Sequence, residues 1–175
     1  PDWTRPRFLQ PGTPADVADL RHPLLEDAVP NSIALPPGRG VLVTGSNMSG
    51  KSTFLRTLGV NAVLAQTIHT CLAREYAAPV FTVLSAMGRS DDLLSGKSYY
   101  IVEVESLLAL VRASERPAPC LFLLDELFRG TNAVERIAAG RAVLQQLVGA
   151  GAPNAHVALA ATHDAELVDL LRDSF

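Results

Sequence analysis

The chain has 175 residues, of which 48% are hydrophobic and 19% are charged, and its formal net charge is −3 at pH 7. This length and composition are typical of one globular domain with a sizeable core. Because the net charge is slightly negative, the segment lacks the basic surface with which proteins bind nucleic acid. We therefore expect any DNA contact to lie elsewhere.

Cysteine usage and hydropathy point to the cytoplasm. The two cysteines, Cys71 and Cys120, are too few for a disulfide framework and lack the spacing of metal ligands, so we predict core residues in a reducing compartment. The apolar stretches are short and interrupted, and no charged segment precedes an apolar run at the N-terminus, so we expect neither secretion nor membrane contact. The chain begins at Pro1 without a methionine, so we expect a fragment of a longer protein.

The first forty residues are rich in proline and turn-forming residues. Proline fixes φ and removes a hydrogen-bond donor. We therefore predict that residues 1–40 are a separate segment of loops and short edge strands that leads into the core domain without joining its core. At most a brief helix is expected near Ala15 to Leu20.

Strands and helices are predicted to alternate over residues 41–175, which we take as the core domain. The predicted strands are Val41 to Thr44, Val80 to Leu84, Cys120 to Leu124 and Val157 to Ala161. The predicted helices are Thr53 to Thr67, Ser98 to Ala113, Ala133 to Val148 and Ala165 to Arg172, with loops at 91–97 and 149–151. This order predicts an α/β fold, with a mostly parallel sheet flanked by helices and a site at the carboxyl ends of the strands.

A phosphate-loop motif lies between the first predicted strand and helix. The run from Gly45 to Ser52 fits G-x-x-x-x-G-K-[ST], in which glycines let backbone N–H groups point at phosphate oxygens. Lys51 would reach the β- and γ-phosphates of ATP, and the Ser52 hydroxyl would bind Mg²⁺. A chance glycine-rich turn is the alternative. The predicted nucleotide-binding residues here are Gly45, Ser46, Asn47, Met48, Ser49, Gly50, Lys51, Ser52 and Thr53.

Two further polar groups follow apolar strands. Asp125 ends one strand, where it would support the Mg²⁺ ion, and the adjacent Glu126 would orient or deprotonate a water that attacks the γ-phosphate. His163 ends another strand, where it would donate a hydrogen bond to the γ-phosphate. An acidic helix start and a structural histidine are the alternatives. Together with the phosphate loop, the pattern favours Lys51, Glu126 and His163 as catalytic residues.

The motifs together resemble the ATPase domain of the MutS DNA mismatch-repair family. The resemblance covers roughly residues 20 to 170 and rests on 21–23, 29–31, 45–52, 90–103, 125–126, 129–132 and 161–163. Two departures are typical of a divergent branch. Tyr99-Tyr100 stands where the family usually has Thr-Phe, and Leu127-Phe128 stands where it usually has Ile-Gly.

The resemblance implies an ABC-type P-loop NTPase that works as a homodimer with composite ATP sites. In that family a serine-containing loop completes the partner's site, and the matching loop here runs from Ser95 to Glu103 with Ser98 at the helix start, where a plain helix cap is the alternative. Asn132 lies where the family has a loop that crosses the dimer interface. The adenine would lie against Arg21, His22, Val29 and Asn31, although the family's aromatic stacking residue is not evident.

The function implied is Mg²⁺-dependent ATP hydrolysis that drives conformational change in a larger DNA-binding protein, in mismatch repair or a related process. ATP and ADP are the expected ligands, and DNA would be bound by domains outside this chain. One alternative is a nucleotide-gated dimerising clamp with little hydrolysis, against which Glu126 argues. The other is a small-molecule P-loop kinase, which would need an arginine-rich lid and an acceptor pocket.

Overall fold

The computed structural model describes residues 3–88, 99–149 and 155–175. The predicted loop at 91–97, the role of Ser98 and most of the predicted glycine-rich loop at 149–151 lie outside these residues.

A four-stranded parallel sheet forms the centre of the molecule, as the alternation of strands and helices predicts. Its strands, in the order β5-β10-β9-β8, are Arg39–Thr44, Val157–Thr162, Cys120–Asp125 and Thr82–Ala86. The side chains of β9 alternate between two cores, with Leu121 and Leu123 in one and Phe122 and Leu124 in the other. An unbroken apolar run therefore marks a strand that is covered on both faces.

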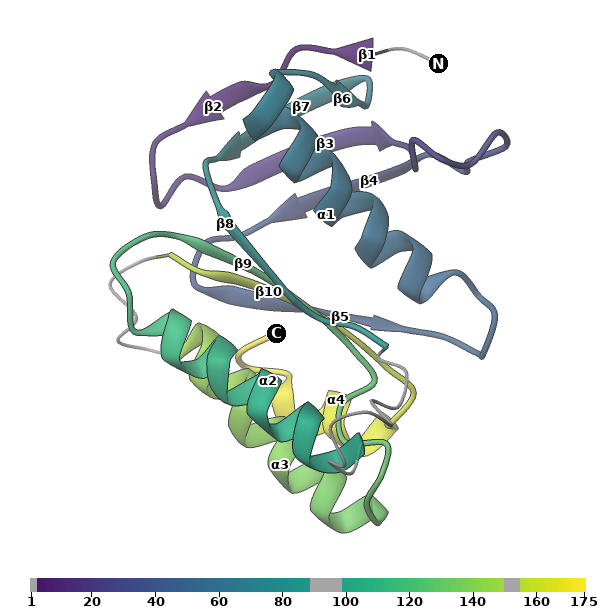
Figure 1. Cartoon of the computed structure of the whole chain (residues 1–175), viewed down its shortest axis with the longest axis vertical. Coiled ribbons are helices and arrows are strands. Elements are labelled where there is room, and N and C mark those ends of the chain that lie inside the picture. Colours follow the sequence, from purple (N-terminus) through teal and green to yellow (C-terminus); the bar gives the residue numbers. More distant parts are fainter. Residues whose placement is uncertain (1–2, 89–98, 150–154) are drawn as a thin grey trace.

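Four helices cover this sheet (Figure 1). They are α1 (Lys51–Ile68), α2 (Tyr99–Ser114), α3 (Ala133–Val148) and α4 (Ala165–Leu171). Helices α2, α3 and α4 pack against one face, and α1 packs against the other. All four predicted helices are confirmed, with ends within a few residues of the prediction.

A second, mixed sheet lies beyond α1, and the sequence did not predict it. Its strands, in the order β2-β7-β3-β4, are Arg7–Leu9, Glu75–Pro79, Ala15–Leu20 and Asn31–Leu35. A small antiparallel pair, β1 (Trp3–Thr4) with β6 (Cys71–Leu72), lies beside it.

The predicted helix near Ala15 to Leu20 is wrong, because these residues form strand β3. Strand β3 is also not an edge strand, since it pairs with β4 on one side and β7 on the other. Ala15 and Val17 are buried while Asp16 between them is exposed, which is the period-two alternation of a strand. These residues share a core with Leu55 and Leu58 of α1, so the proline-rich segment contributes to the core that it was expected only to precede.

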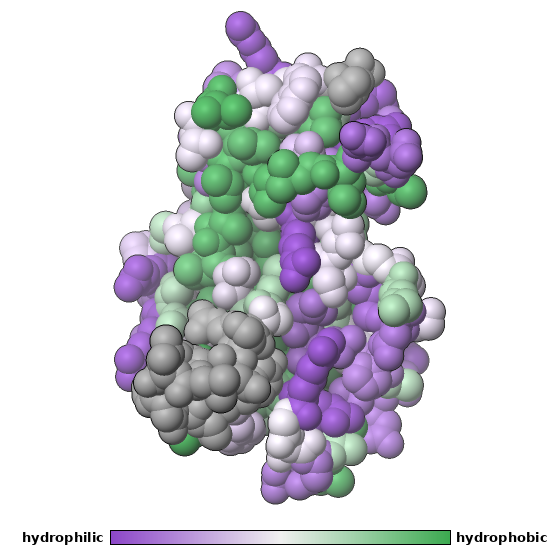
Figure 2. All heavy atoms as spheres, turned by 45° about the vertical axis from the view of Figure 1, so that its right-hand side comes forward, coloured by the Kyte–Doolittle hydropathy of each residue, from purple (hydrophilic) through white to green (hydrophobic). Residues whose placement is uncertain are grey.

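Helix α1 is fixed to the N-terminal part of the chain by a buried amide. Asn61 Oδ1 accepts a hydrogen bond from the Leu72 backbone N–H at 2.7 Å, and Asn61 Nδ2 donates to the Arg21 carbonyl at 2.9 Å. The outer side of α1 is exposed at Val60, Val63 and Ile68. Figure 2 shows apolar groups gathered on the upper part of one face, at the height of α1 and the mixed sheet, above a more polar lower part.

The two cysteines lie in the core, as the sequence predicted. Cys71 and Cys120 are buried and unpaired with each other, and burial raises the pKa of the Cys71 thiol to about 11. None of the helices in the described residues combines the length and apolarity needed to cross a bilayer.

Candidate nucleotide-binding site

The predicted phosphate loop joins the end of β5 to the start of α1. Three of its residues adopt positive φ angles, 152° at Gly45, 65° at Met48 and 93° at Gly50. A Cβ atom on Gly45 would lie 2.8 Å from Ser49 Oγ, closer than side chains tolerate. Both glycines of the motif are therefore required by the backbone, independently of any ligand.

Lys51 lies at the base of this loop with only 7% of its surface exposed. Its Nζ donates hydrogen bonds to the carbonyls of Gly45 and Ser46, both at 2.9 Å, which uses two of the three donors of an ammonium group. Gly50, the residue before α1, provides no side-chain cap, so the positive end of the helix dipole is left to the loop. A buried cation and a helix N-terminus together favour an anion at this position.

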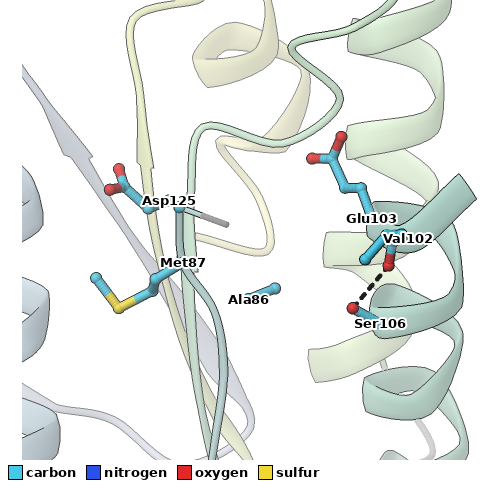
Figure 3. A pocket seen from close by; sticks show the side chains of 7 residues that line it. Ala86, Met87, Val102, Glu103, Ser106 and Asp125 are labelled. Atoms are coloured by element: carbon cyan, nitrogen blue, oxygen red, sulfur yellow. Dashed lines mark hydrogen bonds between the residues drawn. The ribbon is translucent and has the colours of Figure 1, made fainter. Parts of the chain in front are cut away.

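The strand register brings the other predicted residues to the same edge of the sheet. Thr44 of β5 lies opposite Thr162 of β10, and Ala161 of β10 lies opposite Asp125 of β9. The Asp125 Oδ1 atom is buried and has no hydrogen-bond partner within the described part of the chain (Figure 3). An unpartnered carboxylate oxygen at this edge fits the oxygen ligands that Mg²⁺ prefers.

No group of three or more His, Cys, Asp or Glu side chains within the described ranges is arranged to hold a metal ion. A magnesium site does not require one, because Mg²⁺ is usually held by one or two carboxylates together with phosphate oxygens and water. Asp125 fits such a site through its unpartnered oxygen, whereas Ser52 lines the cavity at the loop and its contact with Mg²⁺ stays a prediction.

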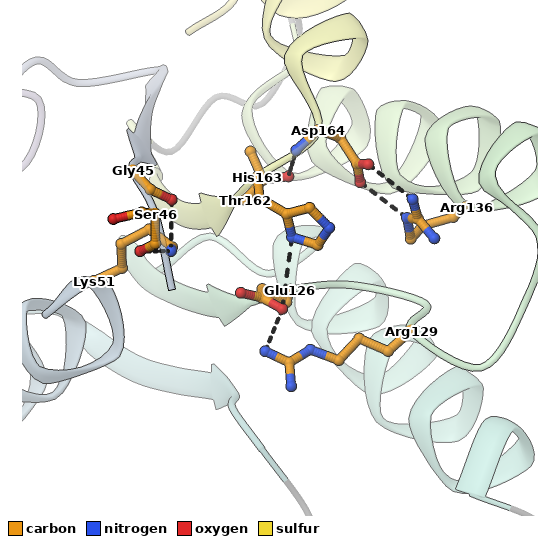
Figure 4. A network of polar contacts seen from close by, with 9 residues as sticks. All are labelled: Gly45, Ser46, Lys51, Glu126, Arg129, Arg136, Thr162, His163 and Asp164. Carbon is orange, nitrogen blue, oxygen red and sulfur yellow. Dashed lines mark hydrogen bonds and ion pairs between the residues drawn. The ribbon is translucent and has the colours of Figure 1, made fainter. Parts of the chain in front are cut away.

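Glu126 lies directly after β9 with its backbone at φ 49° and its N–H donating to the Ala161 carbonyl at 2.9 Å. Its side chain is 11% exposed and forms an ion pair with Arg129. Nδ1 of His163 lies 3.7 Å from the same carboxylate oxygen (Figure 4). The structure therefore brings Glu126 and His163 into one cluster, and it adds Arg129 to them.

Cavities lie at the loop and beside the Glu126 and His163 cluster. One of 380 Å³ is lined by loop residues together with Glu126 and Arg129, and one of 280 Å³ is lined by Glu126, Arg129, Thr162 and His163 among others. The third, of 550 Å³, is lined by loop residues together with His22, Val29, Asn31 and Phe54 among others.

The adenine contacts predicted for His22, Val29 and Asn31 are compatible with the third cavity, since all three line it. Arg21 is not among its lining residues and donates a hydrogen bond to the Ala28 carbonyl instead. Phe54 of α1, which the sequence analysis did not single out, adds an aromatic residue to the lining of this cavity.

Asn132 is the N-cap of α3. Its side-chain oxygen accepts a hydrogen bond from the Glu135 N–H at 3.0 Å, and Thr131 contacts the Glu135 carboxylate. Asn132 lines none of the three cavities. Its contact with a partner subunit stays a prediction, and the cap is the role that the structure gives it.

An ion pair that the sequence did not predict supports His163. Arg136 of α3 donates two hydrogen bonds to Asp164, from Nε at 2.9 Å and from Nη2 at 2.8 Å (Figure 4). These bonds hold the pKa of Asp164 below its usual value. Because Asp164 directly follows His163, the pair fixes the turn that presents the imidazole. Arg136 and Asp164 are 28 residues apart in the sequence, so no local sequence pattern predicts their contact.

The match with known proteins agrees with the resemblance seen in the sequence. Residues 41–174 match the protein family described as MutS domain V, and the chain belongs to the MutS family. Among its relatives, a DNA mismatch repair protein MutS of Thermus thermophilus is 41% identical over 150 residues, which cover 83% of this chain and 18% of that protein. The DNA mismatch repair protein MutS of Thermotoga neapolitana is 35% identical over 176 residues, which cover 97% of this chain and 21% of that protein. The chain thus spans about a fifth of the length of these relatives.

Proposed function

We propose that the chain is a Mg²⁺-dependent ATPase module with a P-loop NTPase fold of the ABC type. The observation that carries the proposal is the shared sheet edge, where the Lys51 loop follows β5 and the Asp125-Glu126 pair ends β9 with only β10 between them. Phosphoryl transfer to water requires a lysine loop that binds the phosphates and nearby carboxylates that hold the metal ion and orient the water.

Each residue has a separable role in this proposal. The backbone N–H groups of residues 45–52 and the Lys51 ammonium bind the phosphates of ATP. When bound, Mg²⁺ neutralises phosphate charge, and Ser52 and Asp125 are the residues that would hold it. Glu126 orients the attacking water and accepts its proton, and His163 donates a hydrogen bond toward the γ-phosphate.

The relatives suggest the process in which this chemistry acts. Since they are named DNA mismatch repair proteins, we propose that ATP hydrolysis drives conformational change in a longer DNA-binding protein of the same kind. The net charge of −3 agrees with DNA contacts in other domains. We also propose a homodimer with composite sites, in which Ser98 and the Asn132 loop contact the partner subunit.

Two variants test hydrolysis and binding separately. Glu126→Gln keeps Ser52 and Asp125, so ATP binding should persist while hydrolysis slows by about a hundredfold or more. Lys51→Ala removes the buried cation, and ATP affinity should fall by about thirty- to a thousandfold. Glu166→Gln, an exposed carboxylate in the first turn of α4, is the matched control for the Glu126 variant.

Steady-state phosphate release and titration with a fluorescent ATP analogue measure the two effects. Wild-type turnover in Glu126→Gln would remove Glu126 from the mechanism. An unchanged dissociation constant in Lys51→Ala would reject the phosphate-loop assignment.

Mixing two inactive variants tests the composite site. Lys51→Ala and Ser98→Arg proteins should each be inactive, because each lesion damages every site of its own homodimer. With random pairing about half of the dimers are mixed and each has one intact site, so activity should return to about a quarter of the wild-type value. Activity of Ser98→Arg alone, together with wild-type specific activity that is independent of protein concentration, would instead indicate a monomeric site.

The ion pair between Arg129 and Glu126 favours a second candidate, the nucleotide-gated clamp. The guanidinium contacts the carboxylate that would otherwise orient the attacking water, so ATP would be held with little turnover. In that case wild-type protein would bind ATP without releasing phosphate, and Arg129→Ala would start or accelerate hydrolysis.

A further inference from the structure

We propose that Glu103 of α2 is a positioning residue that fixes the backbone turn carrying Glu126. The proposal rests on the proposed function, in which Glu126 acts on water. Glu103 touches neither Glu126 nor the phosphate loop, and it acts through the backbone of Phe128.

The turn after β9 is held in an unusual conformation. Glu126 and Phe128 both have positive φ angles, 49° and 57°. Neither is glycine, and such residues keep this left-handed conformation only where surrounding contacts enforce it. Phe128 also stands where the resemblance to the MutS family places a glycine, so this chain needs contacts that a glycine would make unnecessary.

Helix α2 supplies those contacts from its first two turns. Glu103 Oε1 accepts a hydrogen bond from the Phe128 N–H at 2.6 Å. The Phe128 ring is 5% exposed and packs at a tilt against Tyr100, with 6.3 Å between the ring centroids. Phe128 is thus held at its backbone by Glu103 and at its ring by Tyr100, two residues after Glu126.

Glu103 and Asp125 both line a small cavity of about 30 Å³ between α2 and the ends of β8 and β9, and Figure 3 shows them apart, with Glu103 on α2 and Asp125 at the end of β9. Glu103 Oε2 and Asp125 Oδ1 are both buried and have no hydrogen-bond partner among residues 3–88, 99–149 and 155–175. A buried polar atom without a partner costs stability, whereas the other oxygen of Glu103 gains the hydrogen bond from the Phe128 N–H.

The bond needs an acceptor at the right reach and does not need a negative charge. Burial raises the pKa of Glu103, in opposition to the Phe128 N–H and Arg129, which lower it. Glutamine keeps an oxygen acceptor at the same distance, whereas aspartate keeps the charge but is shorter by one carbon–carbon bond, about 1.5 Å. The two substitutions therefore separate reach from charge.

The experiment compares Glu103→Gln, Glu103→Asp and Glu103→Leu in the full chain. Glu115→Leu, an exposed carboxylate directly after the end of α2, is the control. The measurements are kcat and KM for ATP hydrolysis, the exchange rate of the Phe128 amide hydrogen, and circular dichroism to establish that each variant is folded.

We expect Glu103→Gln and Glu115→Leu to stay within about threefold of wild type in kcat and in amide exchange. Glu103→Asp and Glu103→Leu should lower kcat by about tenfold, change KM by less than about threefold, and raise Phe128 exchange by about tenfold, since one hydrogen bond that orients a catalytic group is lost. If the leucine variant is unfolded, the aspartate variant carries the test.

Wild-type kcat and exchange in the aspartate and leucine variants would overturn the proposal. So would a glutamine variant as damaged as the leucine variant, because charge would then be the requirement. A wild-type protein that does not hydrolyse ATP would reject the proposed function instead, and the Phe128 exchange rates would still show whether Glu103 fixes the turn.

Discussion

The ion pair between Arg136 and Asp164 offers a direct measurement of how firmly the His163 turn is held. An exposed ion pair contributes about 0.2–1 kcal/mol, and a hydrogen bond to a charged group in a shielded position contributes about 1.5–3 kcal/mol. The side chains of Arg136 and Asp164 are only 20% and 14% exposed, and they share two hydrogen bonds of 2.9 and 2.8 Å. We therefore expect a coupling free energy of about 1.5–3 kcal/mol.

A double-mutant cycle isolates this term. Urea unfolding of wild type, Arg136→Met, Asp164→Asn and the double variant gives the coupling, and the interaction of the Asp164 charge with the α4 dipole cancels because it is lost in both backgrounds. The matched control is Arg172 with Asp169, which are 2.7 Å apart but 78% and 70% exposed. Their coupling should be no more than about 0.2–1 kcal/mol.

The coupling also has a defined pH dependence. The pKa of Asp164 is lowered in the folded state by the hydrogen bonds from Arg136, so folding favours the ionised form. Its contribution is fully present above the pKa of the unfolded carboxyl, about 3.9, and is lost as the pH falls through the lower folded pKa. We expect a constant coupling from about pH 5 to pH 8 and a decline below about pH 4. A coupling as small as that of the control pair, or one that persists undiminished at about pH 2, would refute the reasoning.

Two further predictions concern buried and capping contacts. His156 is fully buried, with Nδ1 accepting from the Cys120 N–H at 3.0 Å and Nε2 lying 2.8 Å from the Ser114 carbonyl. His156→Leu leaves both backbone groups unpaired and should lower the free energy of unfolding by about 2–4 kcal/mol in urea, whereas a loss below about 1 kcal/mol would mean that water replaces the ring. Asn132→Ala should cost about 1 kcal/mol by thermal unfolding through the lost α3 cap, while Asn132→Ser should cost under about 0.3 kcal/mol. Equal losses of stability in the Asn132→Ala and Asn132→Ser variants would show that the Asn132 side chain does not stabilise α3 as its cap.

The elements of the central sheet were predictable because their signals are local. The buried strand β9 is a continuous apolar run, and α3 begins after the capping residue Asn132 and ends before Gly149, where the sequence placed its ends. Strand β3 was mistaken for a helix because apolar and polar residues alternate only weakly in Ala-Asp-Val-Ala-Asp-Leu. The surrounding prolines also favoured loops over a sheet. Its partners β4 and β7 decide its conformation, and β7 lies far along the chain.

The candidate site likewise has residues that the sequence predicts and supporting contacts that it does not. Motif residues follow strand ends, so a parallel sheet carries Lys51, Asp125 and His163 to one edge whatever the details of packing. The contacts that hold those residues in place come from tertiary packing and leave no motif. Glu103 and Phe128 are 25 residues apart, and no periodicity joins them.

The two sides of the site rest on different parts of the fold. The Lys51 loop continues into α1, which packs in the core shared with the mixed sheet. The Glu126 turn and His163 are held by α2 and α3, which pack in the core on the opposite face of the central sheet. Since the strands of the central sheet separate these two cores in the described part of the chain, a change behind α2 should alter the position of Glu126 and leave the loop unchanged. This separation is the physical reason to expect that losing the bond to Phe128 lowers kcat with little effect on ATP binding.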